Sequence, residues 1–356
     1  MKELRLTKGS DNVVVGEFAD VEKPTPKDDQ VLIKVVVTGT NPKDWKYIGA
    51  GKQPRPFNSG DDIAGIVEAV GPKVLDFKPG DRVAAFHVMH DPHGSFAEYA
   101  IAPAHTTFIV PPNISFEEAA TIPLVALTSA IGLYQELGLP TPWARGTDPH
   151  NPKGRNPIPI VIYGGTTSVG LTALKFARLS GLYPIITIAG GSRDIIEKDN
   201  LADVIIDYRN NPNIADEIRK ALNGQELKHA FDGFAEPPTS DPIAEVLSTN
   251  GGKISGILPY GDGKLPNGHK WKMTYVGSAH KVYPPFPADD VEVDKEFAYV
   301  FSRYLTRALE QGKFKPHPHE VLKGGLGGIV EGLNRLREGK VKGSKLVARI
   351  GDTEGL

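Results

Sequence analysis

The sequence predicts an α/β protein with two domains, one β-rich and the other built on a doubly wound parallel sheet. The chain has 356 residues, too many for one ordinary domain and about right for two. Short β-branched runs joined by glycine and proline turns occupy residues 1–125, and strands alternate with helices after them. Hydrophobic residues make up 40% and charged residues 24%, a balance that can bury a sizeable core.

Several short strands are expected in the β-rich part, because β-branched residues cluster there between turn residues. Val31–Val37 is one such run, and Ile63–Val70 is another. Pro79 and Gly80 set a turn that leads into a further strand, and Phe96–Ile101 reads as a strand as well. Short strands joined in this way predict a small barrel-like sheet.

An apolar helix is expected after the β-rich part. Ser115 and Glu118 form a capping-box sequence, and the apolar run that follows extends from Thr121 to Tyr134. At roughly 14 residues this run is shorter than the roughly 20 that span a bilayer, so we expect a buried helix. The N-terminus has no apolar signal-peptide core, which predicts a cytoplasmic protein.

Strands and helices alternate in the second half of the chain. The expected strands are Ile158–Tyr163, Pro184–Ala189, Val204–Ile206, His229–Asp232 and Gly252–Leu258. The expected helices between them are Ser168–Ser180, Asp194–Asn200 and Ile214–Leu222. This alternation implies a doubly wound parallel sheet. A long helix at Asp294–Gln311 and a last strand at Leu346–Ile350 follow.

A glycine-rich turn joins the first of these strands to the first helix. Gly164 and Gly165 allow a tight turn and a close approach of backbone amides to a pyrophosphate, and Gly170 allows the helix to pack on the strand. The phosphates would lie at the positive end of that helix. The candidate cofactor contacts are Gly164, Gly165, Thr166, Thr167, Ser168 and Val169. A mere tight turn is the alternative, since the spacing is not G-x-G-x-x-G.

The end of the second strand predicts NADPH rather than NADH. An NADH site normally has an acidic residue there, but this chain continues with Gly190, Gly191, Ser192 and Arg193. The guanidinium of Arg193 suits a 2′-phosphate, and a hydroxyl at Ser192 could add to it. The candidate contacts on this side are Gly190, Ser192, Arg193, Lys198 and Tyr208. The alternative is that Arg193 is a solvated loop charge.

Composition excludes several kinds of site and partner. Without cysteine the chain has no disulfide, no thiolate catalysis and no Cys-based zinc site. A net charge of −2 with interspersed signs indicates no nucleic-acid and no membrane partner. His87, His90 and His93 recur regularly, but Pro92 and Gly94 make this a loop, so we favour a substrate contact by His87 or His93 over a metal role.

Six segments together resemble the medium-chain dehydrogenase/reductase superfamily. They are Asn41–Lys46, Gly60–Gly71, Lys78–Val83, Gly94–Tyr99, Tyr163–Gly170 and Gly343–Arg349. They occur in family order and extend over nearly the whole chain. Within the superfamily the chain is most similar to the zinc-free quinone oxidoreductases and the ToxD-like trans-acting enoyl reductases. Zinc-dependent relatives carry Gly-His-Glu where this sequence has Gly60, Asp61 and Asp62.

The resemblance implies the domains and the reaction. A GroES-like catalytic domain would comprise residues 1–125, completed by 285–356, and a Rossmann domain for NADPH would comprise 126–284. The implied activity is NADPH-dependent, zinc-independent hydride transfer to an activated double bond of an enoyl or alkenal substrate. That substrate is a small molecule or an acyl chain carried by a polyketide synthase. The alternatives are a quinone or aldehyde reductase, and a cofactor-binding protein recruited for non-redox work.

The resemblance also implies the catalytic residues and the remaining cofactor contacts. It places the loop from Asn41 to Tyr47 beside the nicotinamide ribose. There Lys46 would donate to a ribose hydroxyl or to the developing enolate, Asp44 would hold that ammonium, and Tyr47 is a second possible proton donor. The alternative is that Asp44 and Lys46 only fix the loop, with Asp44 capping the turn. Further implied cofactor contacts are Asn41, Lys46, Thr128, Leu258 and Lys345.

The oligomeric state is left open between monomer and homodimer. Dimeric relatives pair subunits through an edge strand, and Tyr275–Ser278 is the candidate for that strand here.

Overall fold

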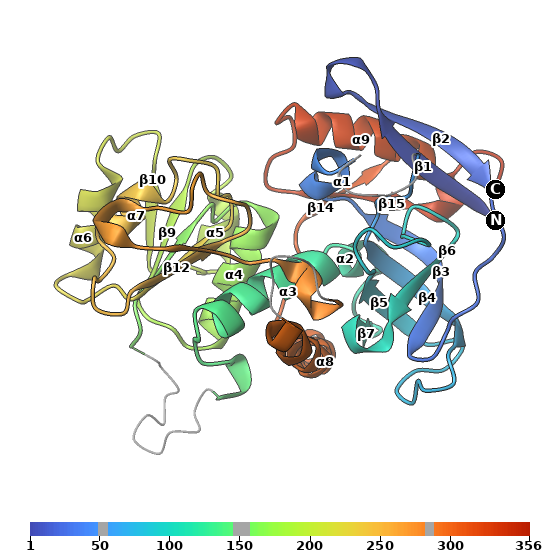
Figure 1. Ribbon diagram of the computed structural model, residues 1–356, viewed down its shortest axis with the longest axis horizontal. Coiled ribbons are helices and arrows are strands. Elements are labelled where there is room, and N and C mark those ends of the chain that lie inside the picture. Colours follow the sequence, from blue (N-terminus) through green and yellow to red (C-terminus); the bar gives the residue numbers. More distant parts are fainter. Residues whose placement is uncertain (49–55, 145–156, 282–287) are drawn as a thin grey trace. The chain divides into compact units, whose positions relative to one another are not determined.

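The computed structural model describes residues 1–48, 56–144, 157–281 and 288–356. They form two compact units (Figure 1). Unit 1 comprises Met1–Leu124 and Gly277–Leu356, and unit 2 comprises Val125–Val276. The chain re-enters unit 1 at Gly277 rather than at residue 285. It does so because Ser278 donates a hydrogen bond to Asp294, and because the His280 ring packs on Phe86, 4.6 Å between centroids.

Unit 1 is built on a mostly antiparallel sheet that the C-terminal tail completes. Among the described residues the strand order is β14-β15-β3-β4-β5-β7, with β6 paired to β3. The strands are β3 (Gln30–Gly39), β4 (Asp62–Val70), β5 (Arg82–Phe86), β6 (Tyr99–Pro103), β7 (Thr107–Ile109), β14 (His319–Leu322) and β15 (Lys345–Arg349). β15 pairs antiparallel with β3, with Val347 opposite Gly39, while β14 pairs parallel with β15.

A separate hairpin and several helices cover this sheet. The hairpin is β1 (Lys2–Lys8) with β2 (Val14–Asp20), which the sequence analysis did not anticipate. The helices are α1 (Pro42–Lys46), α2 (Phe116–Ala119), α8 (Ala288–Glu310) and α9 (Gly328–Arg337). The core combines side chains from both ends of the chain. Leu4, Ile33 and Ile63 pack in one apolar cluster with Ile329 and Leu346. The two termini lie side by side, and the Lys2 ammonium donates to the carbonyl of residue 355 (Figure 1).

Unit 2 is a doubly wound parallel sheet, as the sequence predicts. Its order among the described residues is β10-β9-β8-β11-β12-β13, and every pair is parallel. The strands are β8 (Ile160–Tyr163), β9 (Ile185–Ala189), β10 (Val204–Asp207), β11 (His229–Asp232), β12 (Lys253–Gly256) and β13 (Trp271–Met273). The connecting helices are α4 (Ser168–Leu179), α5 (Asp194–Lys198), α6 (Ile214–Leu222) and α7 (Asp241–Ala244). The strand order reverses between β8 and β11, and ligands of such sheets bind beyond the carboxyl ends at that point.

The candidate edge strand at Tyr275–Ser278 is wrong. Val276–Ala279 form a 3₁₀ helix, and the edge of the sheet is β13 (Trp271–Met273) instead. The indole of Trp271 anchors that strand, since it packs on Tyr260 in a tilted arrangement, 4.8 Å between centroids, and donates to the Leu258 carbonyl. Val276 is already buried where the chain leaves the sheet.

The apolar run after the capping box is interior helix, as expected, although it is irregular. Ser115 and Glu118 close the predicted capping box, with bonds of 2.9 and 3.1 Å. α3 (Pro123–Ala130) then continues into a π-helical segment, Ile131–Glu136. In the described part of the chain, residues 116–136 are the one helical stretch long and apolar enough to cross a membrane. Its most apolar window is 83% buried inside the protein.

A buried ion pair joins the separate pieces of unit 1. Asp62, the first residue of β4, accepts at Oδ2 from the Lys345 ammonium and from the Asn41 amide, each at 2.6 Å. Its Oδ1 accepts from the backbone N–H of Leu124 at 2.7 Å. Lys345 also donates to Asn41 Oδ1 at 3.0 Å, so the set is closed by hydrogen bonds. One carboxylate thereby connects the ends of β3, β4 and β15 with the start of α3.

We predict that Lys345→Met lowers the free energy of unfolding by about 3 kcal/mol, because it leaves the Asp62 carboxylate buried without its cation. Urea unfolding followed by circular dichroism measures the change. The control is Lys340→Met, which removes a surface ion pair to Glu338 and should cost less than about 1 kcal/mol. Equal losses in the two variants would show that the buried pair contributes no more than a surface pair.

Candidate active site

The short helix α1 carries the predicted catalytic residues and begins directly after β3. Asn41 precedes it, and Pro42 at its first position has the backbone angle that a helix start requires. The Asp44 carboxylate accepts from the Asn41 backbone N–H at 2.7 Å, which closes the first turn. Asp44 is fully buried. The turn-closing role that the sequence left as an alternative is therefore present.

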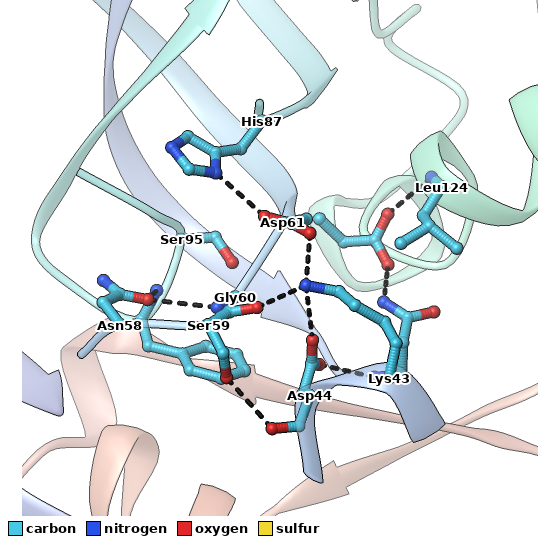
Figure 2. Close-up of polar contacts among 12 residues, drawn as sticks. Lys43, Asp44, Asn58, Ser59, Gly60, Asp61, His87, Ser95 and Leu124 are labelled. Atoms are coloured by element: carbon cyan, nitrogen blue, oxygen red, sulfur yellow. Dashed lines mark hydrogen bonds and ion pairs between the residues drawn. The ribbon is translucent and has the colours of Figure 1, made fainter. Parts of the chain in front are cut away.

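The Lys43 ammonium lies within a cluster of buried oxygens (Figure 2). It contacts Asp44 Oδ1 at 2.9 Å and donates to the Ser59 carbonyl at 2.5 Å. It also forms a short ion pair with Asp61 Oδ2. These three oxygens match the three protons of an ammonium group. Both carboxylates are buried, so the pairing takes place away from bulk water.

His87 extends this cluster from the end of β5. Its Nδ1 lies 2.8 Å from Asp61 Oδ1, and its Nε2 lies 3.0 Å from the Pro92 carbonyl (Figure 2). A carbonyl and an ionised carboxylate can only accept, so both contacts are hydrogen bonds only when both ring nitrogens carry a proton. Two carboxylates, one ammonium and one imidazolium then sum to zero charge. His87 is 2% exposed, so the substrate contact considered for it is wrong.

The two carboxylates compete for one ammonium, and this separates their pKa values. Burial raises the pKa of Asp44 to about 7, and the nearby Asp61 charge adds to the rise while Lys43 opposes it. Burial would also raise the pKa of Asp61, but Lys43 and the His87 hydrogen bond outweigh it and the pKa is lowered. Burial opposes the charged form of Lys43, yet both carboxylates together raise its pKa.

Lys46 and Tyr47 stand at the C-terminal end of α1. The Lys46 ammonium lies over the Trp45 ring, 5.7 Å from its centroid, and both Lys46 and Tyr47 are partly exposed. Asp44 does not hold the Lys46 ammonium as expected, because its carboxylate is bound to Lys43 and to the turn. The Lys8 ammonium donates to the Lys46 carbonyl at 3.1 Å, which ties the end of α1 to β1.

In unit 2 the glycine turn has the close contacts expected of a phosphate-binding turn. Gly164 has φ +72°, a conformation that favours glycine, and the turn leads into the 12-residue helix α4. A Cβ on Gly165 would lie 2.2 Å from Thr187 Oγ1, and one on Gly170 would lie 2.1 Å from the Gly164 carbonyl. Thr167 caps the helix by accepting from the Gly170 N–H at 3.0 Å. Thr166, Ser168 and Val169 complete the turn and the first residues of the helix, all partly exposed.

The ends of β9 and β10 bring together most of the predicted 2′-phosphate contacts. Tyr208 lies against Gly190, where a Cβ would be 2.9 Å from its ring. Arg193 is about half exposed, and among the described residues its guanidinium has long ion-pair contacts of 3.6 Å with Glu197 and Asp207. Ser192 precedes it with φ +58°. No acidic residue ends β9, since the strand runs from Ala189 into Gly190.

Asp207, at the end of β10, is neutralised by another arginine. Arg209 binds it through two hydrogen bonds of 2.9 and 2.7 Å. These bonds lower the pKa of Asp207 to about 2. Lys198 is separated from Arg193 by the length of α5 and is exposed at its C-terminal end.

The other predicted cofactor contacts have protein partners or are buried. Asn41 and Lys345 both belong to the Asp62 cluster described above. Thr128 is buried on α3. The carbonyl of Leu258 accepts from the Trp271 indole at 3.0 Å. Their role toward a cofactor stays a prediction.

Sequence reasoning missed Lys43 and Asp61 as members of a site. The sequence held one indication of these residues. Asp61 and Asp62 stand directly before an apolar strand, and acidic side chains that become buried need partners. Their partners come from residues 43, 87 and 345, which spacing alone does not connect. Among the described residues, no group of three histidine or acidic side chains is arranged to hold a metal ion.

Comparison with known proteins gives a consistent family. The model of the alcohol dehydrogenase GroES-like domain matches residues 27–112. Trans-enoyl reductase fsr4 of Gibberella fujikuroi is 39% identical over 313 residues, 85% of this chain and 87% of that protein. Trans-enoyl reductase resD of Aspergillus sclerotiorum is 34% identical over 349 residues, 92% of this chain and 94% of that protein. A mycobacterial protein solved in complex with NADPH has the same fold, with TM-score 0.71, 21% identity and coverage of 98% and 99%.

We predict that Gly170→Ala lowers the stability by about 2 kcal/mol, because the added methyl group overlaps the Gly164 carbonyl and forces the turn to move. Thermal unfolding measures this, and a fluorescence titration with NADPH should show at least roughly tenfold weaker binding. Gly351→Ala is the control, since a Cβ there meets nothing within 4 Å. Unchanged NADPH binding in Gly170→Ala would show that this turn does not bind the cofactor.

We predict that wild-type stability, relative to Asp44→Asn, falls as the pH rises from about 4 to about 8. The Asp44 pKa is raised from 3.8 to about 7 in the folded protein, so its contribution is full below the ordinary value and is lost through pH 7. The loss is at most about 4 kcal/mol, at about 1.4 kcal/mol per pKa unit. Urea unfolding of both proteins across this range measures it. A difference that is constant or grows with pH contradicts the assignment.

Proposed function

Because the chain belongs to the trans-enoyl reductase family of the medium-chain dehydrogenases/reductases, we propose that it reduces an activated double bond with NADPH and without a metal ion. It is an oxidoreductase of the enoyl reductase type that uses a nicotinamide cofactor. The observation that carries the choice of NADPH is the end of β9, where two glycines, Ser192 and half-exposed Arg193 take the place of an acid.

The residues of unit 2 fit a phosphorylated dinucleotide. The turn from Gly164 presents backbone amides at the start of α4, where a pyrophosphate is favoured. Arg209 already neutralises Asp207, so in the described part of the chain Arg193 would give up two long ion-pair contacts to bind a 2′-phosphate. Tyr208 adds a hydroxyl from the neighbouring strand end. The mycobacterial relative in fold was solved with NADPH, which supports this choice.

In unit 1, α1 supplies the donors for the reaction. When bound, the nicotinamide supplies a hydride to the β-carbon of the conjugated carbonyl substrate. Lys46 then stabilises the negative charge that develops on the carbonyl oxygen, and Tyr47 gives the proton that the α-carbon takes up. The substrate gains one hydride and one proton, and no metal is needed to polarise it.

The proposed substrate is an enoyl or alkenal compound, and in the cell an enoyl chain bound to the carrier of a polyketide synthase. The two most informative relatives are both named trans-enoyl reductases, and they match this chain over at least 85% of its length. We assign the catalytic domain to unit 1 and the cofactor domain to unit 2. The proposed location of the protein is the cytoplasm.

An NADPH-oxidation screen tests this proposal with enoyl thioesters, alkenals, quinones and aldehydes. We expect the fastest turnover with enoyl thioesters, unchanged by a metal chelator. Lys46→Ala should lower kcat by roughly 10²-fold, the usual size of a lost acid–base or charge-stabilising group. Arg193→Ala should raise KM for NADPH by at least roughly tenfold and leave KM for NADH almost unchanged.

The matched control is Arg219→Ala, which removes an exposed arginine of α6 whose ion pair to Asp216 lies on the surface. It should behave as the wild type. No NADPH oxidation with any acceptor would refute the enzyme assignment. A preference for NADH that Arg193→Ala does not change would refute the cofactor assignment.

A further inference from the structure

We propose that Lys43 is a positioning residue for the reaction, because its ammonium contacts buried oxygens that fix α1 and thereby the direction of Lys46 and Tyr47. This inference rests on the proposed function of those two side chains. It assigns a role to a lysine that neither the sequence motifs nor the family resemblance singled out.

α1 needs outside support to keep its direction. It has five residues, and isolated helices shorter than about 12 residues are marginal in water. Its start is tied to the sheet through Asn41, and its end through the bond from Lys8 to the Lys46 carbonyl. Between these two ends, Asp44 is buried, Trp45 packs against the apolar core, and Lys43 supplies the ion pair that reaches across to another segment.

Lys43 connects α1 to the segment that enters β4. Its ammonium contacts Asp44 on its own helix, and the Ser59 carbonyl and Asp61 on the other segment (Figure 2). The Ser59 hydroxyl returns a bond of 3.2 Å to the Asp44 carbonyl, so the two segments are joined twice. The ammonium has one hydrogen bond, to the Ser59 carbonyl, and two ion-pair contacts, to Asp44 and Asp61, so a displaced Lys43 side chain would lose contacts with both segments.

Asp61 is itself held in place from a third segment. His87 at the end of β5 binds its other oxygen, and the Pro92 carbonyl orients the His87 ring. A continuous set of contacts therefore runs from the loop after β5 through Asp61 and Lys43 to α1. Only the last of these groups belongs to the helix, so Lys43 is the point where this support reaches it.

Lys46 and Tyr47 lie three and four residues after Lys43, one helical turn further on. A shift of α1 at Lys43 is therefore passed on to both donors. A displacement of about 1 Å of a catalytic group can cost about 10²-fold in rate. The proposed function gives Lys46 the carbonyl oxygen of the substrate and gives the cofactor phosphates to unit 2, so loss of Lys43 should act on kcat much more than on KM for NADPH.

The experiment compares three variants of the full-length protein. Lys43→Met removes the cation, Lys43→Arg keeps it, and Lys43→Met combined with Asp61→Asn removes one charge of each sign and so keeps the net charge of the cluster. We expect kcat with the best enoyl substrate to fall at least tenfold in Lys43→Met and in the double variant. KM for NADPH should change less than twofold, and Lys43→Arg should restore part of kcat.

The double variant separates loss of the positioning contact from a change of net charge, because it removes one charge of each sign from the cluster, and circular dichroism shows whether it is folded. Wild-type kcat in a folded double variant would overturn the proposal. So would a parallel rise of KM for NADPH with the fall of kcat, since that marks a general loss of structure.

A second readout does not depend on activity. Trp45 lies on α1, and the chain has three tryptophans, so Trp143→Phe and Trp271→Phe leave it as the single reporter. Removing the Lys43 ammonium should increase quenching of Trp45 by iodide at least twofold. If wild-type protein oxidises no NADPH, the proposed function fails, and the quenching still decides whether Lys43 fixes α1. Unchanged quenching overturns the positioning role.

Discussion

Two consecutive buried carboxylates, Asp61 and Asp62, stand where the chain enters β4, and each binds a lysine ammonium. Neighbouring residues of an extended chain point to opposite sides, so one carboxylate meets Lys43 and the other meets Lys345. Buried charges are costly unless hydrogen bonds satisfy them fully, and here the carboxylates accept from amides and a histidine as well. This requirement determines where β3, β15, α1 and the start of α3 must lie in unit 1.

The two units fix their candidate site residues by different interactions. Unit 1 uses charge, because a five-residue helix has too few contacts of its own to hold two donors in a fixed direction. Unit 2 shapes its turn with glycines. Gly165 and Gly170 lie so close to Thr187 and Gly164 that a methyl group would not fit. Ion pairs give direction to side chains, whereas glycines leave backbone amides accessible to phosphate.

The charge arrangement also bears on the absence of cysteine and the proposed independence of zinc. The resemblance aligns Gly60, Asp61 and Asp62 with the Gly-His-Glu of zinc-dependent relatives. In this chain the carboxylate at that place is already neutralised by an ammonium that is part of the protein. Because the Lys43 ammonium is part of α1, the protein neutralises this carboxylate with its own side chain. The N–H groups of the ammonium also give the lysine side chain a preferred direction.

The sequence by itself determined the two folds and the outline of the cofactor site. Strand and helix periodicity is a local property, so Ile214–Leu222 and His229–Asp232 have the bounds that the sequence predicts. The glycine turn was predictable for the same reason, since its residues are contiguous. The edge strand was misplaced because Tyr275–Ser278 looks β-like locally, whereas the pairing of β13 is decided by the packing of Trp271.

Only the tertiary structure decided the partners of the charged residues. Lys43, Asp61 and His87 are far apart in the sequence and meet because β4 and β5 pair and α1 folds back beside them. Asp44 was assigned to Lys46, but the ammonium that reaches it belongs to Lys43. Spacing cannot tell which of two nearby lysines pairs with Asp44, because the choice depends on which side chain the fold directs toward the carboxylates.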